Sequence, residues 1–513
     1  MWLLRAGKIP MLKKFPGNFW LINSIEMFER LAYYNLRVVA PIYIMQADNP
    51  GGLHLTAMDK GTIYLWWFAI QSLLPIITGG LADRLGYKRT LTFAISTMML
   101  GYVMMALLRD VSFVSNYWGF FSSIMVLAFG TAFFKPGIQG SLANTLTKET
   151  SSVGWGLFYW VVNVGAFIAH FIPTVLLLAG NNTAEAWRNV FLASAVFTGL
   201  NLILLIEMKD VPTGASQTES IPSVLHRTFK NLMEPRLLCW LAIMSGFWLM
   251  MFQLWDLQPN FIADWVDSSR LAATTQRILP DWVSSKLVEQ TARGPMIPQQ
   301  VFLAVNSLCI ILGVVLTSWL TRHMRTLSAM LIGMGSATAG ILIAGWTMEA
   351  GILVLGIVCF SIGEMTTGPK KSEYLALIAP PGKKALYLGY VNIPAGLGGL
   401  IGSKIAGYVY GHYGEKANLA LRYIAEKTSL KDTVNWDGNI TSLETTLGIA
   451  RTDAMVKLQE LTGLDSTAAT RLLWDTYSPH IYVWVPFAMV GVVSAIALYI
   501  FARMARRWSD MDA

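Results

Sequence analysis

Charged residues are scarce in this sequence. Asp, Glu, Lys and Arg together make up 14% of its 513 residues, whereas a soluble domain carries about a quarter. Hydrophobic residues account for 54%, and the mean hydropathy is +0.48. This composition excludes an ordinary soluble domain and indicates a membrane protein.

Cysteine is also rare, and the motifs of catalysis are absent. Cys239, Cys309 and Cys359 all lie in apolar runs, which favours buried free thiols over a disulfide framework or a metal site. The sequence has no phosphate-binding glycine loop and no nucleophile–base constellation. We therefore predict that the protein is not an enzyme, needs no cofactor, and depends on an ion gradient.

The basic residues form short clusters between apolar segments, so the net charge of +8 does not indicate a nucleic-acid partner. Such clusters are typical of loops on the cytoplasmic side of a membrane. Every second connection between the apolar segments carries such a cluster, so these connections and both termini are predicted to lie in the cytoplasm. The predicted location is a cell membrane, the inner membrane of a bacterium. The members of this set are Lys8 to Lys14, Arg84/Lys88/Arg89, Lys148, Arg227/Lys230, Arg322/Arg325, Lys383/Lys384 and Arg503/Arg506/Arg507.

Apolar segments of about 20 residues, long enough to span a bilayer, occur twelve times. We take the first as a permanent helix and not as a signal peptide. The predicted fold class is therefore an all-α multi-pass membrane protein with 12 transmembrane helices. Their centres lie near residues 30, 70, 98, 129, 166, 198, 249, 310, 336, 362, 397 and 491.

A polar stretch divides these segments into two sets of six. We predict a first six-helix bundle at 1–208, a cytoplasmic linker at 209–236, and a second bundle at 237–513. The second contains two hydrophilic outer loops, 263–297 and 412–478. Amphipathic patches at 282–288, 417–424 and 454–461 predict short surface helices within them.

The first apolar segment, predicted to be one helix from Phe15 to about Met45, carries an unusual polar stripe. At 100° per residue, its polar side chains fall within about 100° of arc. If the stripe faced lipid, each charge would cost roughly 2.5–3.5 kcal/mol. The stripe must therefore face protein or a water-filled cavity. Its members are Glu26, Glu29, Arg30, Tyr33 and Arg37.

The loop between the second and third segments reads Gly-Gly-Leu-Ala-Asp-Arg-Leu-Gly-Tyr-Lys-Arg over residues 79–89. It resembles the signature loop of the major facilitator superfamily, whose fold packs two six-helix bundles. Asp83 and Arg84 are then candidate gating residues, because an acid there can cap or pair with a neighbouring helix end. The alternative is a tight turn with cytoplasmic positive charge.

The stripe itself resembles the first-helix motif E-x-x-E-R-F-x-Y-Y of the proton-dependent oligopeptide transporter family, with Leu31 where the family has Phe. Further matches follow in order: 130–136 resembles the fourth-helix Lys-Pro motif, and 158–165 the fifth-helix F-Y-x-x-I-N-x-G motif. Residues 362–380 resemble the tenth-helix G-E-L…P…L-A-P motif. The chain is identified as an atypical member of this family.

The resemblance implies proton coupling by Glu26, Glu29, Arg30 and Lys135. The chemistry suits the role. A carboxylate held by cations stays ionised until the cations move away, and desolvation then favours its protonated form. The alternative is a static buried cluster that only fixes helix packing.

The resemblance also implies a substrate site. Arg37 matches the residue that binds the peptide carboxylate, a task suited to a guanidinium fork, although it could instead pair with a neighbouring acid or carbonyl. Glu364 matches the acid that holds the peptide's amino end. Polar residues that either line the same cavity or pack between helices are Tyr33, Tyr34, Tyr159, Asn163 and Asn306.

The second half departs from the family pattern. Phe252 stands where the seventh helix usually has an acid, and Asp256 follows one turn later. Lys370, Lys371 and Glu373 are additions, and Lys371 shares a helix face with Glu364. The added cations favour a more anionic or modified peptide, unless both lysines extend to the cytoplasmic surface.

These observations predict a proton symporter that imports short peptides or peptide-like solutes by alternating access. Its partners would be a small-molecule substrate, protons and the lipid bilayer, and no nucleic acid. Two alternatives remain. One is a proton antiporter that exports drug-like or amphipathic solutes, and the other is a non-transporting receptor or scaffold.

Overall fold

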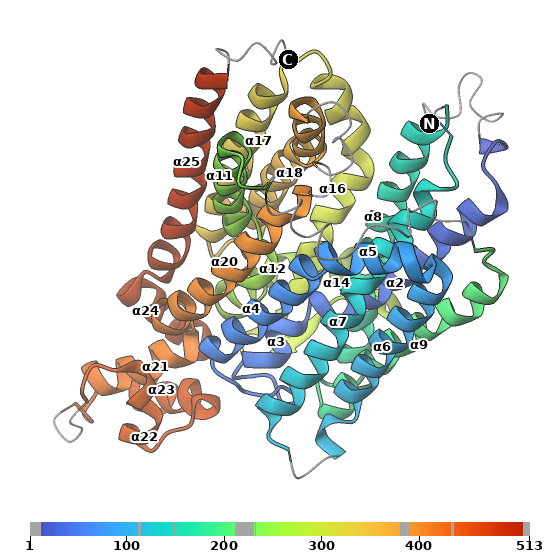
Figure 1. Ribbon diagram of the computed structural model, residues 1–513. Coiled ribbons are helices and arrows are strands. Elements are labelled where there is room, and N and C mark those ends of the chain that lie inside the picture. The colour runs from blue at the N-terminus through green and yellow to red at the C-terminus, as the bar shows by residue number, and fades with distance from the viewer. Residues whose placement is uncertain are drawn as a thin grey trace. The chain divides into compact units, whose positions relative to one another are not determined.

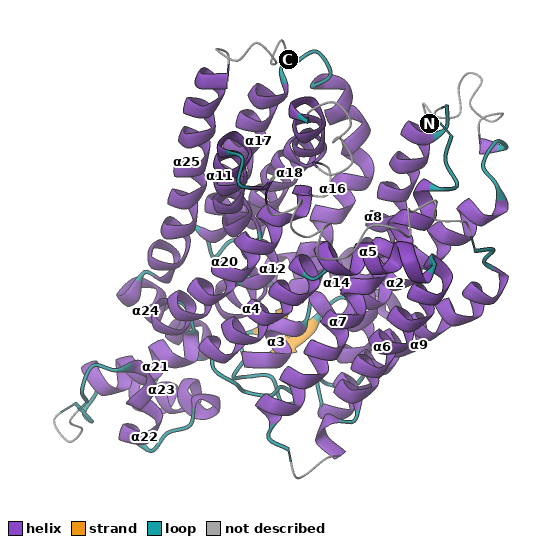
Figure 2. Cartoon of the chain, in the orientation of Figure 1, coloured by secondary structure: helices purple, strands orange, loops and turns teal. Residues whose placement is uncertain are grey.

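A computed structural model describes residues 12–110, 114–147, 149–210, 230, 232–379, 387, 390–431 and 436–505. Helices dominate this part of the chain, which confirms the predicted all-α class (Figure 2). The two strands among these residues, β1 (Glu289–Thr291) and β2 (Gly294–Met296), form one antiparallel hairpin. Several predicted positions lie outside the described residues: Lys8, Lys148, Arg227, Lys383, Lys384, Arg506, Arg507, Pro380 and most of the linker 209–236.

The elements of the first half follow in chain order (Figure 1). They are α2 (Gly17–Arg37), α3 (Ala40–Met45), α4 (Ala57–Leu73), α5 (Pro75–Leu85), α6 (Tyr87–Ala106), η2 (Leu108–Asp110), α7 (Asn116–Ala143), α8 (Ser151–Ala179) and α9 (Ala184–Glu207).

The second half is longer because short helices interrupt it. Its helices are α11 (Pro235–Met251), α12 (Gln253–Asp256), α13 (Gln258–Trp265), α14 (Ser269–Ile278), α15 (Asp281–Ser284), α16 (Gln299–Leu320), α17 (Thr326–Gly345), α18 (Ala350–Ile378), η3 (Tyr390–Asn392), α20 (Ile393–Tyr413), α21 (Lys416–Lys427), η4 (Ile440–Ser442), α22 (Leu443–Leu447), η5 (Arg451–Asp453), α23 (Ala454–Thr462), α24 (Ser466–Tyr477) and α25 (Pro479–Ala505).

Eight helices of the described chain are long and apolar enough to cross a membrane. The pair α4 and α5, bent by 43°, makes a ninth if it forms one span. The remaining three predicted spans coincide with α2, α6 and α20, and α2 contains four charged residues that lower its hydropathy. The protein is thus a multi-pass membrane protein, and the count of twelve stays a prediction.

The first helix is shorter than predicted. The expected single helix from Phe15 to Met45 is broken at Val38 and Val39, between α2 and α3. Pro41, at the start of α3, explains the break, because proline has no N–H and its ring clashes with the carbonyl four residues earlier. That carbonyl belongs to Arg37, which therefore occupies the last turn of α2.

The outer loop 412–478 folds into helices, but they are not all on the surface. α21 and α23 confirm the amphipathic patches at 417–424 and 454–461, whereas α24 was not predicted. Most of α21 is buried, because α22, α23 and α24 pack around it (Figure 1). In the loop 263–297, helix α14 and the β1–β2 hairpin were not predicted, and α15 covers only part of the patch at 282–288.

The chain divides into two compact units that do not follow the chain order. Unit 1 contains residues 1–36, 66–169 and 188–239, and unit 2 contains 37–65, 170–187 and 240–513. Two segments of the first half, 37–65 and 170–187, therefore belong to the same unit as the second-half helices. The division into bundles 1–208 and 237–513 stays a prediction.

Within unit 2, α4 and α20 approach so closely that only glycine fits between them. A Cβ atom on Gly407 would lie 2.5 Å from the carbonyl oxygen of Ala57. A Cβ atom on Gly61 would lie 2.7 Å from the carbonyl oxygen of Ser403. This contact joins a first-half helix directly to a second-half helix.

We expect Gly407→Ala to lower the free energy of unfolding by about 1–3 kcal/mol, because the backbones must separate to admit the methyl group. Gly351→Ala is the control, since a Cβ atom there would meet nothing within 4 Å. Thermal unfolding of both variants in detergent measures the difference. Equal stability of the two variants would contradict the close contact.

Candidate functional site

The charges at the centre of the stripe form a buried cluster in unit 1. Glu26, Glu29 and Arg30 of α2 are 5%, 1% and 8% exposed. The Arg30 guanidinium bonds to the Glu29 carboxylate, and its Nε lies 3.2 Å from Oε1 of Glu26. Lys135 of α7 acts electrostatically on both carboxylates. The charges are buried in protein, as the cost of exposing them to lipid predicted.

A proline of α7 and a glycine of α8 lie beside this cluster. Pro136 follows Lys135 inside α7. On α8, a Cβ atom at Gly165 would lie 3.1 Å from Cβ of Arg30, so glycine lets this helix pack against the guanidinium stem. The motifs at 130–136 and 158–165 therefore meet the first-helix motif in space, within one unit.

The aromatic candidates of unit 1 differ in their surroundings. The Tyr33 hydroxyl donates to Oε1 of Gln71 at 3.4 Å, and the Arg30 guanidinium lies 5.0 Å from the Tyr33 ring centre. Tyr34 packs edge-on against Tyr33. Asn163 donates its side-chain N–H to the Tyr159 carbonyl one turn earlier in α8, at 2.9 Å. Their substrate role stays a prediction.

Arg37 belongs to unit 2, where its guanidinium pairs with the Asp256 carboxylate at the end of α12. Both side chains are buried. The Ser403 hydroxyl donates to the other oxygen of Asp256 at 2.7 Å, and the Tyr64 ring lies under the guanidinium at 4.5 Å. Asp256 thus supplies an acid one turn after Phe252. Arg37 thus pairs with an acid, which was the alternative to substrate binding in the sequence analysis. Its contact with substrate stays a prediction.

Lys60, which the sequence analysis did not single out, extends this polar network. It is 1% exposed, and its Nζ donates to the Asp256 carbonyl at 2.7 Å and to Oδ1 of Asn260 at 2.9 Å. Asn260 donates in turn to Oε1 of Gln46 at 3.2 Å. In the sequence, Lys60 is only a lysine at the start of an apolar segment, and exposed loop lysines are equally common at such positions.

Glu364 forms a second acidic position in unit 2. It accepts a hydrogen bond from the Asn306 side chain at 2.9 Å, so these two predicted residues are brought together. Lys371 acts electrostatically on Glu364, and its ammonium lies 4.3 Å from the centre of the Trp248 ring. Phe252 packs on the same indole.

The two added lysines behave differently. Lys370 is 8% exposed, and its Nζ lies 2.9 Å from Oε2 of Glu373, so that glutamate balances its charge. The reading in which both lysines extend to the surface is therefore wrong for Lys370. Lys371, beside Glu364 and Trp248, is the added cation that remains close to the predicted substrate residues.

The predicted gating loop is anchored within unit 1. The Tyr87 hydroxyl donates to Oδ1 of Asp83 at 2.7 Å, and Arg84 lies in the last turn of α5. Gly86, with φ of 88°, makes the sharp turn between α5 and α6 that side chains rarely allow. Lys88 donates to the Met208 carbonyl just after α9, at 2.8 Å. A gating role for Asp83 and Arg84 stays a prediction.

Comparisons with known proteins agree with this architecture. The family model described as Major Facilitator Superfamily matches residues 24–270. The matched stretch, just under half of the chain, is thus similar to that superfamily. Among solved structures, a POT family transporter in complex with 5-aminolevulinic acid is similar with a TM-score of 0.64 at 14% identity, covering 96% of each chain. The nucleoside transporter NupG is equally similar, with a TM-score of 0.64 at 12% identity, covering 94% of this chain and all of that one.

Curated relatives confirm the resemblance to the oligopeptide transporter family. "Dipeptide and tripeptide permease A" of Serratia proteamaculans (strain 568) is 27% identical over 255 residues, 49% of this chain and 46% of the relative. The permease of the same name from Escherichia coli (strain K12) is 28% identical over 43% of this chain and 41% of the relative. An uncharacterized transporter of Bacillus subtilis (strain 168) is 28% identical over 31% and 32%. The matched stretch thus spans less than half the length of these relatives.

Proposed function

We propose that this chain is a proton-coupled symporter that imports short peptides or peptide-like solutes by alternating access. The observation that carries the proposal is the buried cluster of Glu26, Glu29 and Arg30, on which the half-buried Lys135 acts electrostatically. Two acids and two bases share one site inside a membrane protein, and ionisable groups at that depth are functional by default. The permeases named above as relatives support peptides as the substrate class.

The cluster can couple proton movement to a conformational change. While Arg30 contacts both carboxylates and Lys135 acts on them, two cations balance the two acids, which favours the ionised form of the acids. A movement of α7 that withdraws Lys135 leaves two carboxylates with one cation. One acid then takes up a proton, because an unbalanced buried charge is costly. The reverse movement releases it.

The remaining parts of the proposal follow from the same arrangement. A proton gradient is the energy source, and no cofactor takes part. The chain lies in the inner membrane of a bacterium with both termini in the cytoplasm, as its basic connections suggest. Asp83 and Arg84 act at a cytoplasmic gate. Arg37 and Glu364 receive the two ends of the peptide, with Tyr33, Tyr34, Tyr159, Asn163 and Asn306 along the cavity.

Uptake into proteoliposomes tests this function. Purified protein, reconstituted with an inward proton gradient, should accumulate labelled di- or tripeptides, and a protonophore should abolish the accumulation. Counterflow without a gradient separates transport from coupling. Export of solute against the same gradient would favour an antiporter. No movement of any peptide by a folded sample would overturn the proposal and leave an exporter of drug-like solutes or a receptor or scaffold.

Lys371 should set the preference for anionic solutes. Lys371→Gln removes a positive charge beside Glu364, so we expect the preference for an acidic over a neutral dipeptide to fall about tenfold, or about 1.4 kcal/mol. Competition against one labelled dipeptide measures the ratio. Lys457→Gln, on exposed α23, is the control for lost charge. An unchanged ratio in Lys371→Gln would separate Lys371 from substrate selection.

A further inference from the structure

A second group of buried charges lies at the predicted outer loops, where the proposed transport mechanism does not use it. Glu415 and Arg451 are only 3% and 7% exposed. Nη1 of Arg451 lies 2.5 Å from Oε1 of Glu415, and Nη2 donates to the His54 carbonyl at 2.6 Å. Arg451 therefore fastens the loop 412–478 to the segment that follows the first helix.

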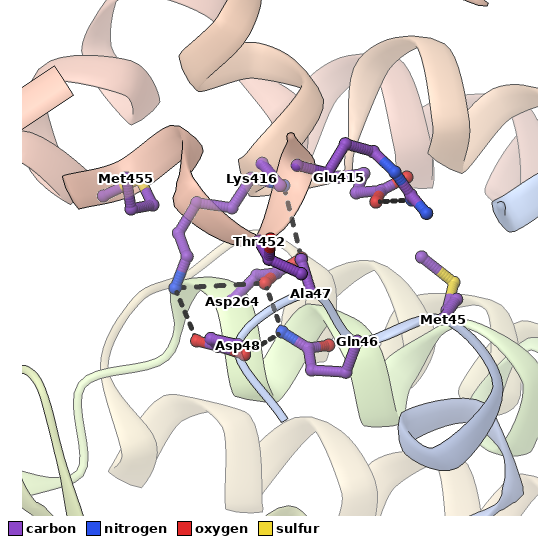
Figure 3. A pocket seen from close by; sticks show the side chains of 11 residues that line it. Met45, Gln46, Ala47, Asp48, Asp264, Glu415, Lys416, Thr452 and Met455 are labelled. Atoms are coloured by element: carbon purple, nitrogen blue, oxygen red, sulfur yellow. Dashed lines mark hydrogen bonds and ion pairs between the residues drawn. The ribbon is translucent and has the colours of Figure 1, made fainter. Parts of the chain in front are cut away.

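A second pair of contacts repeats this connection. Figure 3 shows the Lys416 ammonium reaching the carboxylates of Asp48 and Asp264, at 3.6 and 3.9 Å. The Gln46 side chain donates to the same two acids, at 2.9 and 2.8 Å. Two cations of the loop 412–478 thus hold the segment 46–54 at separate points.

A run of hydrogen bonds connects this cluster to Asp256 and Arg37. Gln46 bonds to Asn260, Asn260 to Lys60, and Lys60 to the Asp256 carbonyl, whose carboxylate holds Arg37. All these residues belong to unit 2. Asp264 is therefore connected to the end of the first helix by hydrogen bonds through Gln46, Asn260 and Lys60, and by the Arg37–Asp256 ion pair.

Burial gives this cluster a response to pH. Removal from water raises the pKa of Glu415 to about 7, although the Arg451 guanidinium opposes the rise. Burial also raises the pKa of Asp264. Charged and titratable groups that face Glu415 or its partner are Lys60, Asp264, Lys416, Arg451, Tyr410, Asp48, Asp59, Glu444 and His54.

Proton binding to Glu415 and closure of these contacts are thermodynamically linked, so the difference in pKa between the closed and open arrangements gives the direction of the pH response. If these contacts open, Glu415 returns to water and to its ordinary pKa of about 4.5. The closed arrangement therefore binds the proton more tightly than the open one, and proton uptake favours closure. This contribution is fully present below pH 4.5 and is lost as the pH rises through about 7.

We infer that Glu415 and Arg451 are positioning residues of an outer gate, which fastens the loop 412–478 to residues 46–54 and closes when it takes up a proton from outside. The inference rests on the proposed function and deepens it, since an importer must close its outer side after loading. The loop 412–478 then has a task in the transport cycle. Arg37 and Asp256 lie at the inner end of the same gate.

Distance measurements between spin labels test the gate without substrate or gradient. Labels at Pro50→Cys and Val456→Cys, both exposed positions, would report the separation of the two segments in the full chain in nanodiscs. Cys239, Cys309 and Cys359 are first replaced by Ser. Between pH 7.5 and 5.5 we expect the ratio of short to long distances to rise about twentyfold, with most of the rise below pH 7.

Three variants assign the response. Glu415→Gln, which imitates the protonated acid, should give mainly short distances at both pH values. Arg451→Gln should give longer distances at both, because the bond to the His54 carbonyl is lost. Glu460→Gln, whose acid pairs only with exposed Lys457 among the described contacts, should respond like the unsubstituted protein.

The pH dependence of the distance between the two labels in the unsubstituted protein can contradict the inference. Distances that do not change between pH 7.5 and 5.5, or that lengthen at acidic pH, contradict it in the unsubstituted protein, whatever the folding of the variants. A response that survives in Glu415→Gln but disappears in His54→Gln would assign the sensor to the imidazole. Peptide uptake with unresponsive distances defeats the gate alone, and responsive distances without uptake defeat the proposed function alone.

Discussion

Glu29→Gln should reduce gradient-driven peptide uptake to the level of empty vesicles while counterflow continues. The substitution keeps the shape and hydrogen-bonding capacity of the side chain but removes the charge that Arg30 balances. Glu26 remains 3.2 Å from the same guanidinium, so we expect a stability loss of only about 1.5–3 kcal/mol. Paired uptake and counterflow assays in proteoliposomes measure the separation.

Glu207→Gln is the matched control for Glu29→Gln, because that acid lies exposed at the end of α9. It should leave both assays unchanged. Retention of gradient-driven uptake in Glu29→Gln would refute the coupling role. Loss of both assays in a folded variant would assign Glu29 to the packing of the cluster and not to proton movement.

Asp256→Asn should destabilise the protein by about 3–5 kcal/mol, because it leaves the Arg37 guanidinium buried without a carboxylate. Thermal unfolding in nanodiscs measures the loss. Asp475→Asn, at an exposed position of α24, is the control and should change stability little. A variant as stable as this control would mean that Arg37 has another sufficient partner when Asp256 is neutral.

The double variant Arg37→Leu/Asp256→Leu separates the two roles of Arg37. Stability should return, since apolar side chains of similar volume replace a buried ion pair at little cost. Transport should not return if Arg37 also binds the substrate carboxylate. Full uptake by the stable double variant would reduce Arg37 to a partner of Asp256.

The polar stripe was predictable from sequence because its energetics are local. Periodicity puts Glu26, Glu29 and Arg30 on one face, and the cost of charge in lipid requires that face to be covered. The covering residues come from α7 and α8, whose motifs were also readable in the sequence. Their assembly into one unit follows from helix packing that only the structure shows.

Other features depended on contacts that no local pattern contains. The partner of Arg37 is Asp256, more than two hundred positions along the chain. The amphipathic period of α21 predicted a face to be covered, but not that α22, α23 and α24 cover it. Lys60 resembled a loop lysine in the sequence, and only the structure shows its hydrogen bonds to the Asp256 carbonyl and to Asn260.

The first helix, which ends at the break after α2, has residues in both compact units. Residues up to Leu36 belong to unit 1, with the acids and bases of the cluster, whereas Arg37 and α3 belong to unit 2. Arg30 and Arg37 are separated by two turns of α-helix, about 10 Å along the helix axis. One unbroken helix thus carries the proposed proton-coupling acids near its middle and, in its last turn, the arginine whose ion pair with Asp256 holds its end.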